Sequence, residues 1–365
     1  MIMMIFMSLY TVVDGIFVSR LVGSDALSAV NIVWPVLSVS NALGIMLASG
    51  GSAVIATKLG EGKSKTAREN FSFLVVTGLM ISLLLLFATF LFLDPIVWAL
   101  GSNQALYDYC CDYLKFSILF APACMLQNLF QCFFVTAGKP GLGLSLTVIA
   151  GLANAFFDYF LMGALGMGVR GAALATGIGQ MIPAIAGLIY FFCTGHSTDS
   201  KEADSNHLFF SRFHFDGPVL VNSCINGSSE MVSNLSNAVV TYLFNIVLMR
   251  LAGEDGVAAI TIILYGQFLF NALYLGFSIG VGPVISFNYG AKNKRRLQTV
   301  YKICTAFVLL SSLIIGAAAF FSADFISAVF VEKGSDTFLL TATGFSIFAV
   351  NYLFSGYNIF SSGLF

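Results

Sequence analysis

The chain of 365 residues is 58% hydrophobic and only 10% charged, and its mean hydropathy is +0.89. Soluble domains carry about 25% charged residues, so this composition excludes an ordinary soluble protein and indicates a polytopic membrane protein. The formal net charge of −1 excludes the strongly basic surface that nucleic-acid binding requires. The spacing of the seven cysteines and three histidines is not typical of a metal site, so we expect no cofactor.

Long apolar segments separated by charged or glycine-rich turns follow one another along the chain. Each segment is long enough to cross a bilayer, which takes about 20 residues. The longest polar stretch, 196–216, follows the sixth segment and is predicted to be a cytoplasmic linker. We therefore predict an all-α integral membrane fold with an N-terminal lobe at 1–195 and a C-terminal lobe at 217–365. The ten predicted spans are residues 1–21, 27–57, 70–94, 112–137, 141–164, 169–194, 217–250, 257–288, 298–330 and 337–365.

Basic residues fall mainly in the turns after the even-numbered spans, which hold 12 of the 17 lysines and arginines. Basic loops remain in the cytoplasm, so these turns and the N-terminus are predicted to be cytoplasmic. The turns at Gly23 and Met167 then both face outward. The twelve basic residues are Lys58, Lys63, Lys65, Arg68, Lys139, Lys201, Arg212, Lys292, Lys294, Arg295, Arg296 and Lys302.

The second part of the chain repeats the first at an offset of 230 residues without gaps. Residues 23–29 align with 253–259, and the charged turn 61–68 aligns with 291–298. An even number of spans per unit keeps the same orientation, which predicts two lobes related by an axis along the membrane normal. Two lobes of six spans require twelve in all, and both chain ends fall inside apolar runs. We therefore expect a fragment that lacks the last two spans.

A polar layer is predicted near mid-membrane depth. Asn154 and Asp158 stand one helical turn apart and share a face. Asp158 lies nine residues before Met167 and Thr176 nine residues after it, which places both at roughly 13 Å below the outer turn. Asp14 lies at a similar distance from the first outer turn. A carboxyl group at this depth costs about 2.5–3.5 kcal/mol on insertion scales, so these four residues are predicted to bind a proton or a cation, the alternative being a structural hydrogen-bond network.

Glu230 lies in an unusually polar part of the seventh predicted span. It is a candidate for lining a wet substrate cavity, and the alternative is a charge near the cytoplasmic end of its helix. Gln180, Gln267 and Asn271 are further candidates for such a cavity, although each also suits hydrogen bonding between packed helices.

Four motifs together resemble the multidrug and toxic compound extrusion (MATE) family, in its bacterial and archaeal branches. They are VVDGIFVSRLVGSDALSAV at 12–30, ASGGSAVIATKLGEGK at 48–63, the stretch 154–176, and GVGPVISFNYGAKNKRR at 280–296. The resemblance covers essentially the whole chain. It implies a cell-membrane antiporter that exports amphiphilic organic cations in exchange for H⁺ or Na⁺, and we expect it to act as a monomer.

The resemblance also implies which residues surround the coupling ion. A helix 1 aspartate, an Asn-x-x-x-Asp pair and a helix 6 threonine fall on Asp14, Asn154, Asp158 and Thr176. Some branches place the coupling carboxylates in the C-terminal lobe instead. The last predicted span, 337–365, contains no acidic residue, which favours the N-terminal site.

Two other functions compete with antiport. A flippase for lipid-linked saccharides exposes basic residues to its cavity, whereas no predicted helix core here holds lysine or arginine. An intramembrane aspartyl enzyme could use Asp14 and Asp158 as an acid–base pair, but no second catalytic signature accompanies them. We therefore predict a transporter and not an enzyme.

Overall fold

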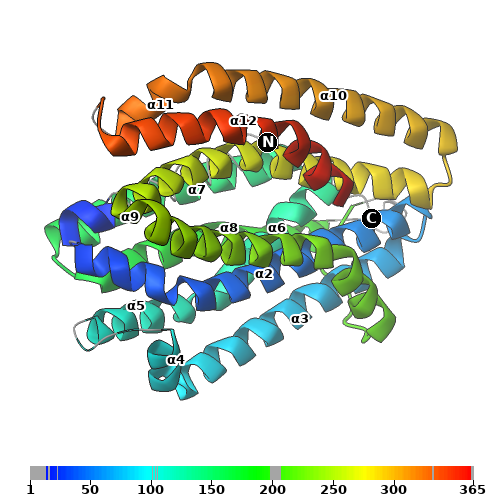
Figure 1. Ribbon diagram of the computed structural model, residues 1–365. Coiled ribbons are helices and arrows are strands. Elements are labelled where there is room, and N and C mark those ends of the chain that lie inside the picture. The colour runs from blue at the N-terminus through cyan, green and yellow to red at the C-terminus, as the bar shows by residue number, and fades with distance from the viewer. Residues whose placement is uncertain are drawn as a thin grey trace.

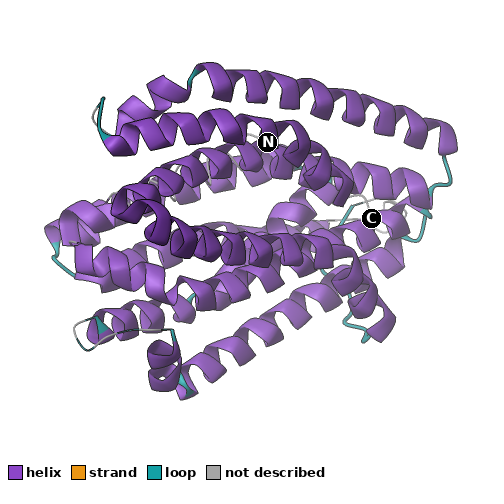
Figure 2. Cartoon of the chain, viewed as in Figure 1, coloured by secondary structure: helices purple, strands orange, loops and turns teal. Residues whose placement is uncertain are grey.

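A computed structural model describes residues 14, 17–22, 24–100, 102, 104, 106–197, 207–330 and 333–362. These residues form helices and loops and contain no strand (Figure 2), which confirms the predicted all-α fold. Within this part of the chain, seven helices are long and apolar enough to cross a membrane, or eight if one bent pair counts as a single span. The predicted first span, 1–21, lies largely outside the described residues.

The helices of the first half follow the predicted spans closely. The bent pair is α5 and α6, which meet at 49° where Pro122 occupies the first turn of α6 and cannot continue the preceding helix. The elements are η1 (Val18–Val22), α2 (Ser24–Gly60), α3 (Ser64–Leu91), α4 (Leu93–Ala99), α5 (Tyr107–Leu119), α6 (Ala121–Thr136), α7 (Pro140–Asp158), η2 (Tyr159–Ala164) and α8 (Gly168–Ser197).

The second half holds α9 (Gly217–Gly290), α10 (Lys294–Phe321), α11 (Ala323–Phe330) and α12 (Asp336–Ser362). The prediction of two separate spans at 217–250 and 257–288 is wrong in one respect, because helical structure continues through the expected turn. The chain nevertheless reverses within α9 (Figure 1). A Cβ at Gly256 would lie 3.1 Å from the Leu248 carbonyl oxygen, although eight residues of straight helix span about 12 Å. A tight helical bend therefore replaces the predicted loop.

The repeat of 230 residues is confirmed by the element boundaries. α2 ends at Gly60 and α9 at Gly290, and the helices that follow each turn begin and end at the same offset. Both turns use the left-handed conformation at equivalent positions, with φ of 75° at Gly62 and 54° at Lys292. The hydrogen bonds repeat as well: the amide of residue 61 donates to residue 57 and that of residue 291 to residue 287, each at 2.9 Å. The two chain segments therefore fold alike.

The two repeats touch through their matching glycines. A Cβ at Gly60 would overlap the Phe287 carbonyl oxygen, and a Cβ at Gly290 would overlap the Thr57 carbonyl oxygen. Since 57 and 287 differ by the same 230 residues, this contact is reciprocal, as a two-fold axis requires. It lies at the side of the bundle that carries the α2–α3 and α9–α10 turns (Figure 1), hereafter the basic side. A second close contact joins Gly50 of α2 to Ser223 of α9.

The hydrophobic clusters before the polar stretch 196–216 are separate from those after it. The buried residues of two clusters all lie at or before Val219, and those of three other clusters all lie at or after Ile260. The larger N-terminal cluster contains stacked aromatic rings at Phe130, Phe134 and Phe191. Part of the predicted linker, 207–216, also packs onto this cluster, since Leu208 is 1% exposed. Residues 198–206 lie outside the described part.

Candidate functional site

Two carboxyl groups meet inside the N-terminal half. Asp14 lies just before η1, and Asp158 is the last residue of α7 and is fully buried. Their side chains lie close enough to interact directly, although no hydrogen bond joins them. Two carboxylates this close in an apolar surrounding cannot easily both be ionised, so the pair can hold one proton between them or bind a cation.

Asn154 and Thr176 complete the predicted polar layer. The Asn154 side-chain nitrogen donates to the Thr176 hydroxyl at 3.5 Å, across the α7–α8 contact. Asn154 is 2% exposed and stands one turn before Asp158 on the same face of α7. Close helix contact makes this possible, because a Cβ at Gly179 would lie 3.2 Å from the Asn154 Cβ. The structure thus brings all four predicted residues together.

Four buried oxygen atoms at this site accept no hydrogen bond from any described residue. They are one oxygen each of Asp14 and Asn154 and both carboxyl oxygens of Asp158. A buried polar atom without a partner costs about 1–3 kcal/mol, so such a group of oxygens favours the binding of a proton, a cation or water. Protons and hard cations such as Na⁺ both bind oxygen, and the site suits either.

Both carboxylates are followed by π-helical turns. The π-helix η1 begins four residues after Asp14, and η2 begins directly after Asp158, and the two segments contact each other. π-helices make up well under 1% of residues and occur often at functional sites. Hydropathy patterns carry no signal for a π-turn, so the sequence analysis did not find them.

Tyr113 on α5 is a residue of this site that sequence reasoning missed. It is 5% exposed, and its hydroxyl lies close enough to Asp14 and Asp158 to interact electrostatically with both carboxyl groups. The neighbouring Asp112 forms a salt bridge with Arg170 of α8, with an N–O distance of 2.8 Å. The depth argument compared residues around two turns only and gave no reason to include α5.

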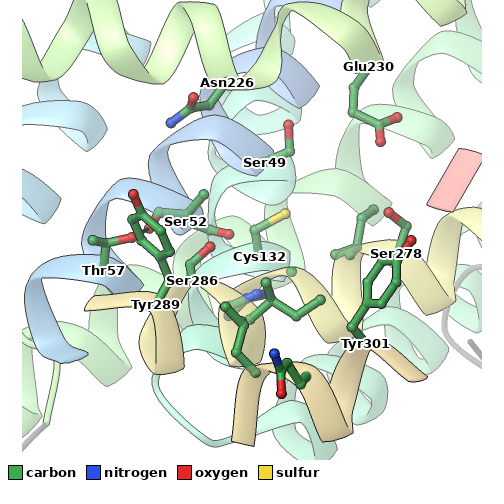
Figure 3. A pocket seen from close by; sticks show the side chains of 17 residues that line it. Ser49, Ser52, Thr57, Cys132, Asn226, Glu230, Ser278, Ser286, Tyr289 and Tyr301 are labelled. Atoms are coloured by element: carbon green, nitrogen blue, oxygen red, sulfur yellow. Dashed lines mark hydrogen bonds between the residues drawn. The ribbon is translucent and has the colours of Figure 1, made fainter. Parts of the chain in front are cut away.

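Glu230 lies elsewhere, in a cavity of about 540 Å³ between α2, α9 and α10. Its side chain points toward the cavity from the first arm of α9 (Figure 3), and the residue is 5% exposed. The described lining contains no lysine or arginine, so Glu230 is the only charged group in it. The other polar residues around the cavity are Ser49, Ser52, Thr57, Asn226, Ser278, Ser286, Tyr289, Gln298 and Tyr301.

The three remaining candidates do not join this cavity. Gln180 lies on α8, and Gln267 and Asn271 lie on α9, and all three are half-buried. The Asn271 carboxamide oxygen is buried without a hydrogen-bond partner among the described residues. α2 connects the two sites: its first third packs beside Tyr113, and its last third lines the Glu230 cavity.

The sequence profile of the MatE family matches residues 1–160 and 231–365. The chain belongs to the MatE family. Members of the MatE family are multidrug efflux transporters that span the membrane several times, and not enzymes. "Multidrug export protein MepA" of Staphylococcus haemolyticus (strain JCSC1435) is 26% identical over 370 residues, which cover 96% of this chain and 77% of that protein. The MepA protein of Staphylococcus saprophyticus is 23% identical over 368 residues, with 96% and 77% covered.

Solved MatE structures share the fold. A MATE protein in complex with MaD3S superimposes with a TM-score of 0.90 at 21% identity, covering 100% of this chain and 80% of that one. A transporter of the MOP superfamily from Pyrococcus furiosus gives a TM-score of 0.89 at 22% identity, with the same coverage. The bundle of this MatE chain is therefore that of the family.

Proposed function

We propose that this MatE protein is a secondary active antiporter that exports amphiphilic, cationic organic compounds in exchange for H⁺ or Na⁺. The observation that carries the proposal is the meeting of Asp14 and Asp158, of which one Asp14 oxygen and both Asp158 oxygens are buried and accept no hydrogen bond from a described residue. An ionisable group inside a membrane bundle is costly and marks an ion pathway.

Coupling follows from the charge of the pair. When the pair is fully charged, repulsion between the carboxylates favours the uptake of one proton or one Na⁺. Binding of that ion removes the repulsion and lets η1 and η2 pack closely, so the ion has different affinities for the two arrangements. A difference in affinity between two states is what allows an ion gradient to drive a conformational cycle.

The substrate side of the proposal rests on Glu230. A cavity with a single carboxylate and many hydroxyl groups favours a cationic ligand with hydrogen-bond donors, and Tyr289 and Tyr301 supply aromatic faces. Alternating access then opens the cavity to one side at a time by rocking the two repeats about their axis. The described residues of the lining do not include the lysines or arginines that a flippase for phosphate-linked saccharides would need. The carboxyl pair has the role of an ion site and not of an acid–base catalyst.

The experiment that tests the proposal is transport in proteoliposomes. We expect efflux of a fluorescent organic cation to accelerate when a proton gradient or a sodium gradient is imposed, and the gradient that works identifies the coupling ion. Vesicles with collapsed gradients serve as the control. Equal transport with and without both gradients would contradict antiport, whereas transport of lipid-linked saccharides alone would favour the flippase.

Replacing Tyr113 by phenylalanine should weaken coupling without unfolding the protein. The substitution removes the hydroxyl that interacts electrostatically with both carboxyl groups, and the coupling free energy between two interacting sites is typically about 1–3 kcal/mol. We expect about a 10-fold weaker response to the gradient. Tyr109→Phe is the matched control, because Tyr109 lies one turn earlier on α5 and is 40% exposed. If both variants respond alike, Tyr113 has only a packing role.

A further inference from the structure

Residues 207–216, hereafter the strap, bind along the N-terminal half on its basic side. Arg68 of α3 donates to the His207 carbonyl oxygen at 3.0 Å, and its guanidinium lies 4.1 Å from the centre of the Phe209 ring. The Ser211 amide donates to the Ser72 hydroxyl at 2.8 Å. The strap ends at Asp216, which caps α9 by accepting from the Val219 amide at 3.2 Å. Backbone and side-chain contacts therefore fix its position on α3.

The strap lies beside the start of the apolar run of α3. Its Phe213 and Phe215 rings lie 5.9 and 5.5 Å from the ring of Phe73, centre to centre. Phe73 stands one turn beyond Glu69, the last charged residue of α3, and no charged residue follows it before Asp94. The apolar run that starts here is long enough to cross the hydrocarbon core. The two rings therefore lie at the boundary where membrane proteins concentrate aromatic residues.

The outer face of the strap is apolar and basic at once. Phe213 is 52% and Phe215 71% exposed. Arg212, which precedes Phe213, and His214, which lies between the two phenylalanines, are exposed as well. Arg212 and Phe213 line a surface hollow together with His214 and Glu69. Large exposed rings beside a free guanidinium suit a partner that offers an apolar chain and an anion next to each other.

The charges around the hollow favour an anionic partner. Arg212 and the exposed Lys65 form no ion pair with any described residue, whereas Lys58 and Lys63 both pair with Glu61. Glu69 is the one carboxylate in the hollow, and it forms no salt bridge with Arg212. The Arg212 guanidinium in the hollow therefore has no ion-pair partner among the described residues, and Lys65 adds a second exposed cation one turn before Glu69 on α3.

We propose that the strap is a binding site for an anionic phospholipid of the leaflet on the basic side. The Phe213 and Phe215 rings lie among the upper acyl chains, and the Arg212 guanidinium binds the lipid phosphate. A basic residue near a membrane surface attracts anionic lipid by about fivefold. The site lies outside both the carboxyl pair and the Glu230 cavity and does not depend on the transport reaction.

A tryptophan at position 215 tests the proposal in vesicles of phosphatidylcholine with a minor fraction of phosphatidylglycerol. The native Trp34 and Trp98 are replaced by phenylalanine, so that Phe215→Trp introduces the only tryptophan, which is excited selectively over tyrosine. In one set of vesicles the phosphatidylcholine carries bromine on its upper acyl carbons, and in the other set the phosphatidylglycerol does. Quenching of the tryptophan fluorescence is measured in each set. We expect phosphatidylglycerol to quench more than its mole fraction predicts, by up to about fivefold. Phe213→Trp provides a second reporter if the first variant does not fold.

Arg212→Gln separates the two parts of the proposal. We expect it to abolish the preference for phosphatidylglycerol and to leave quenching in fully brominated membranes unchanged. Arg295→Gln, an exposed basic residue of α10, is the control and should keep the preference. If the protein that retains Arg212 is quenched by the two lipids only in proportion to their mole fractions, the anionic site is overturned. A tryptophan that emits as in water and is not quenched at all would overturn the membrane contact and indicate a protein partner instead.

Discussion

Asp158→Asn is expected to abolish gradient-driven efflux. Asparagine keeps the size of the side chain but can neither ionise nor release a proton, so the pair with Asp14 loses its exchangeable ion. Coupling between two ligands is typically worth about 1–3 kcal/mol, so stimulation by the gradient should fall by about 5- to 150-fold. Folding should survive, because asparagine has nearly the same size as the buried Asp158 side chain and the new amide can donate to Asp14.

The measurement compares efflux under the imposed gradient with efflux after its collapse. Asp108→Asn is the matched control, since Asp108 is an exposed carboxylate on α5. Binding of the fluorescent cation at equilibrium should persist in the Asp158 variant, because the Glu230 cavity is unchanged. Gradient stimulation equal to that of the unmodified protein would show that Asp158 is a structural residue.

The meeting of Asp14, Asn154, Asp158 and Thr176 could be predicted in part. Counting residues from a turn fixes depth, because every residue of a helix rises by the same 1.5 Å. The spacing of Asn154 and Asp158 also fixes their shared face. Which way helix 1 turns Asp14 depends on packing between helices far apart in sequence, and no count along the chain supplies it. Tyr113 could not be predicted either, because its approach to the carboxyl groups also depends on how α5 packs against the other helices.

The repeat was the more reliable signal, because a gapless offset tests many positions together. It predicted the matching turns at Gly62 and Lys292 although the residue types differ. It could not show that α9 stays helical through its bend, since glycine and acidic residues at 253–256 are also what a loop contains. The sequence did not predict that the strap packs onto α3, because the polar composition of 196–216 indicated a linker. Two of its residues, Phe209 and Phe210, nevertheless contact Arg68 and Phe71 of α3.

Gly290→Val is expected to hold the basic side of the protein open. No Cβ fits at Gly290, because the Thr57 carbonyl oxygen occupies its place, and the reciprocal contact at Gly60 must separate with it. Overpacking a close contact costs about 1–3 kcal/mol, which shifts the equilibrium away from the closed arrangement by about 5- to 150-fold. Transport requires both arrangements, so the cycle should slow by a similar factor.

The native thiol of Cys132 reports the opening, because this residue lines the Glu230 cavity and is 5% exposed. In a variant that retains only this cysteine, Gly290→Val should speed its reaction with a membrane-impermeant maleimide from the basic side. Gly280→Val is the matched control: Gly280 lies on the same helix, and a Cβ there would meet no atom within 4 Å. If thiol reactivity and transport change equally in both variants, the glycine contact does not control closure. If only Gly290→Val changes them, the closed state depends on the approach of the two repeats at Gly60 and Gly290.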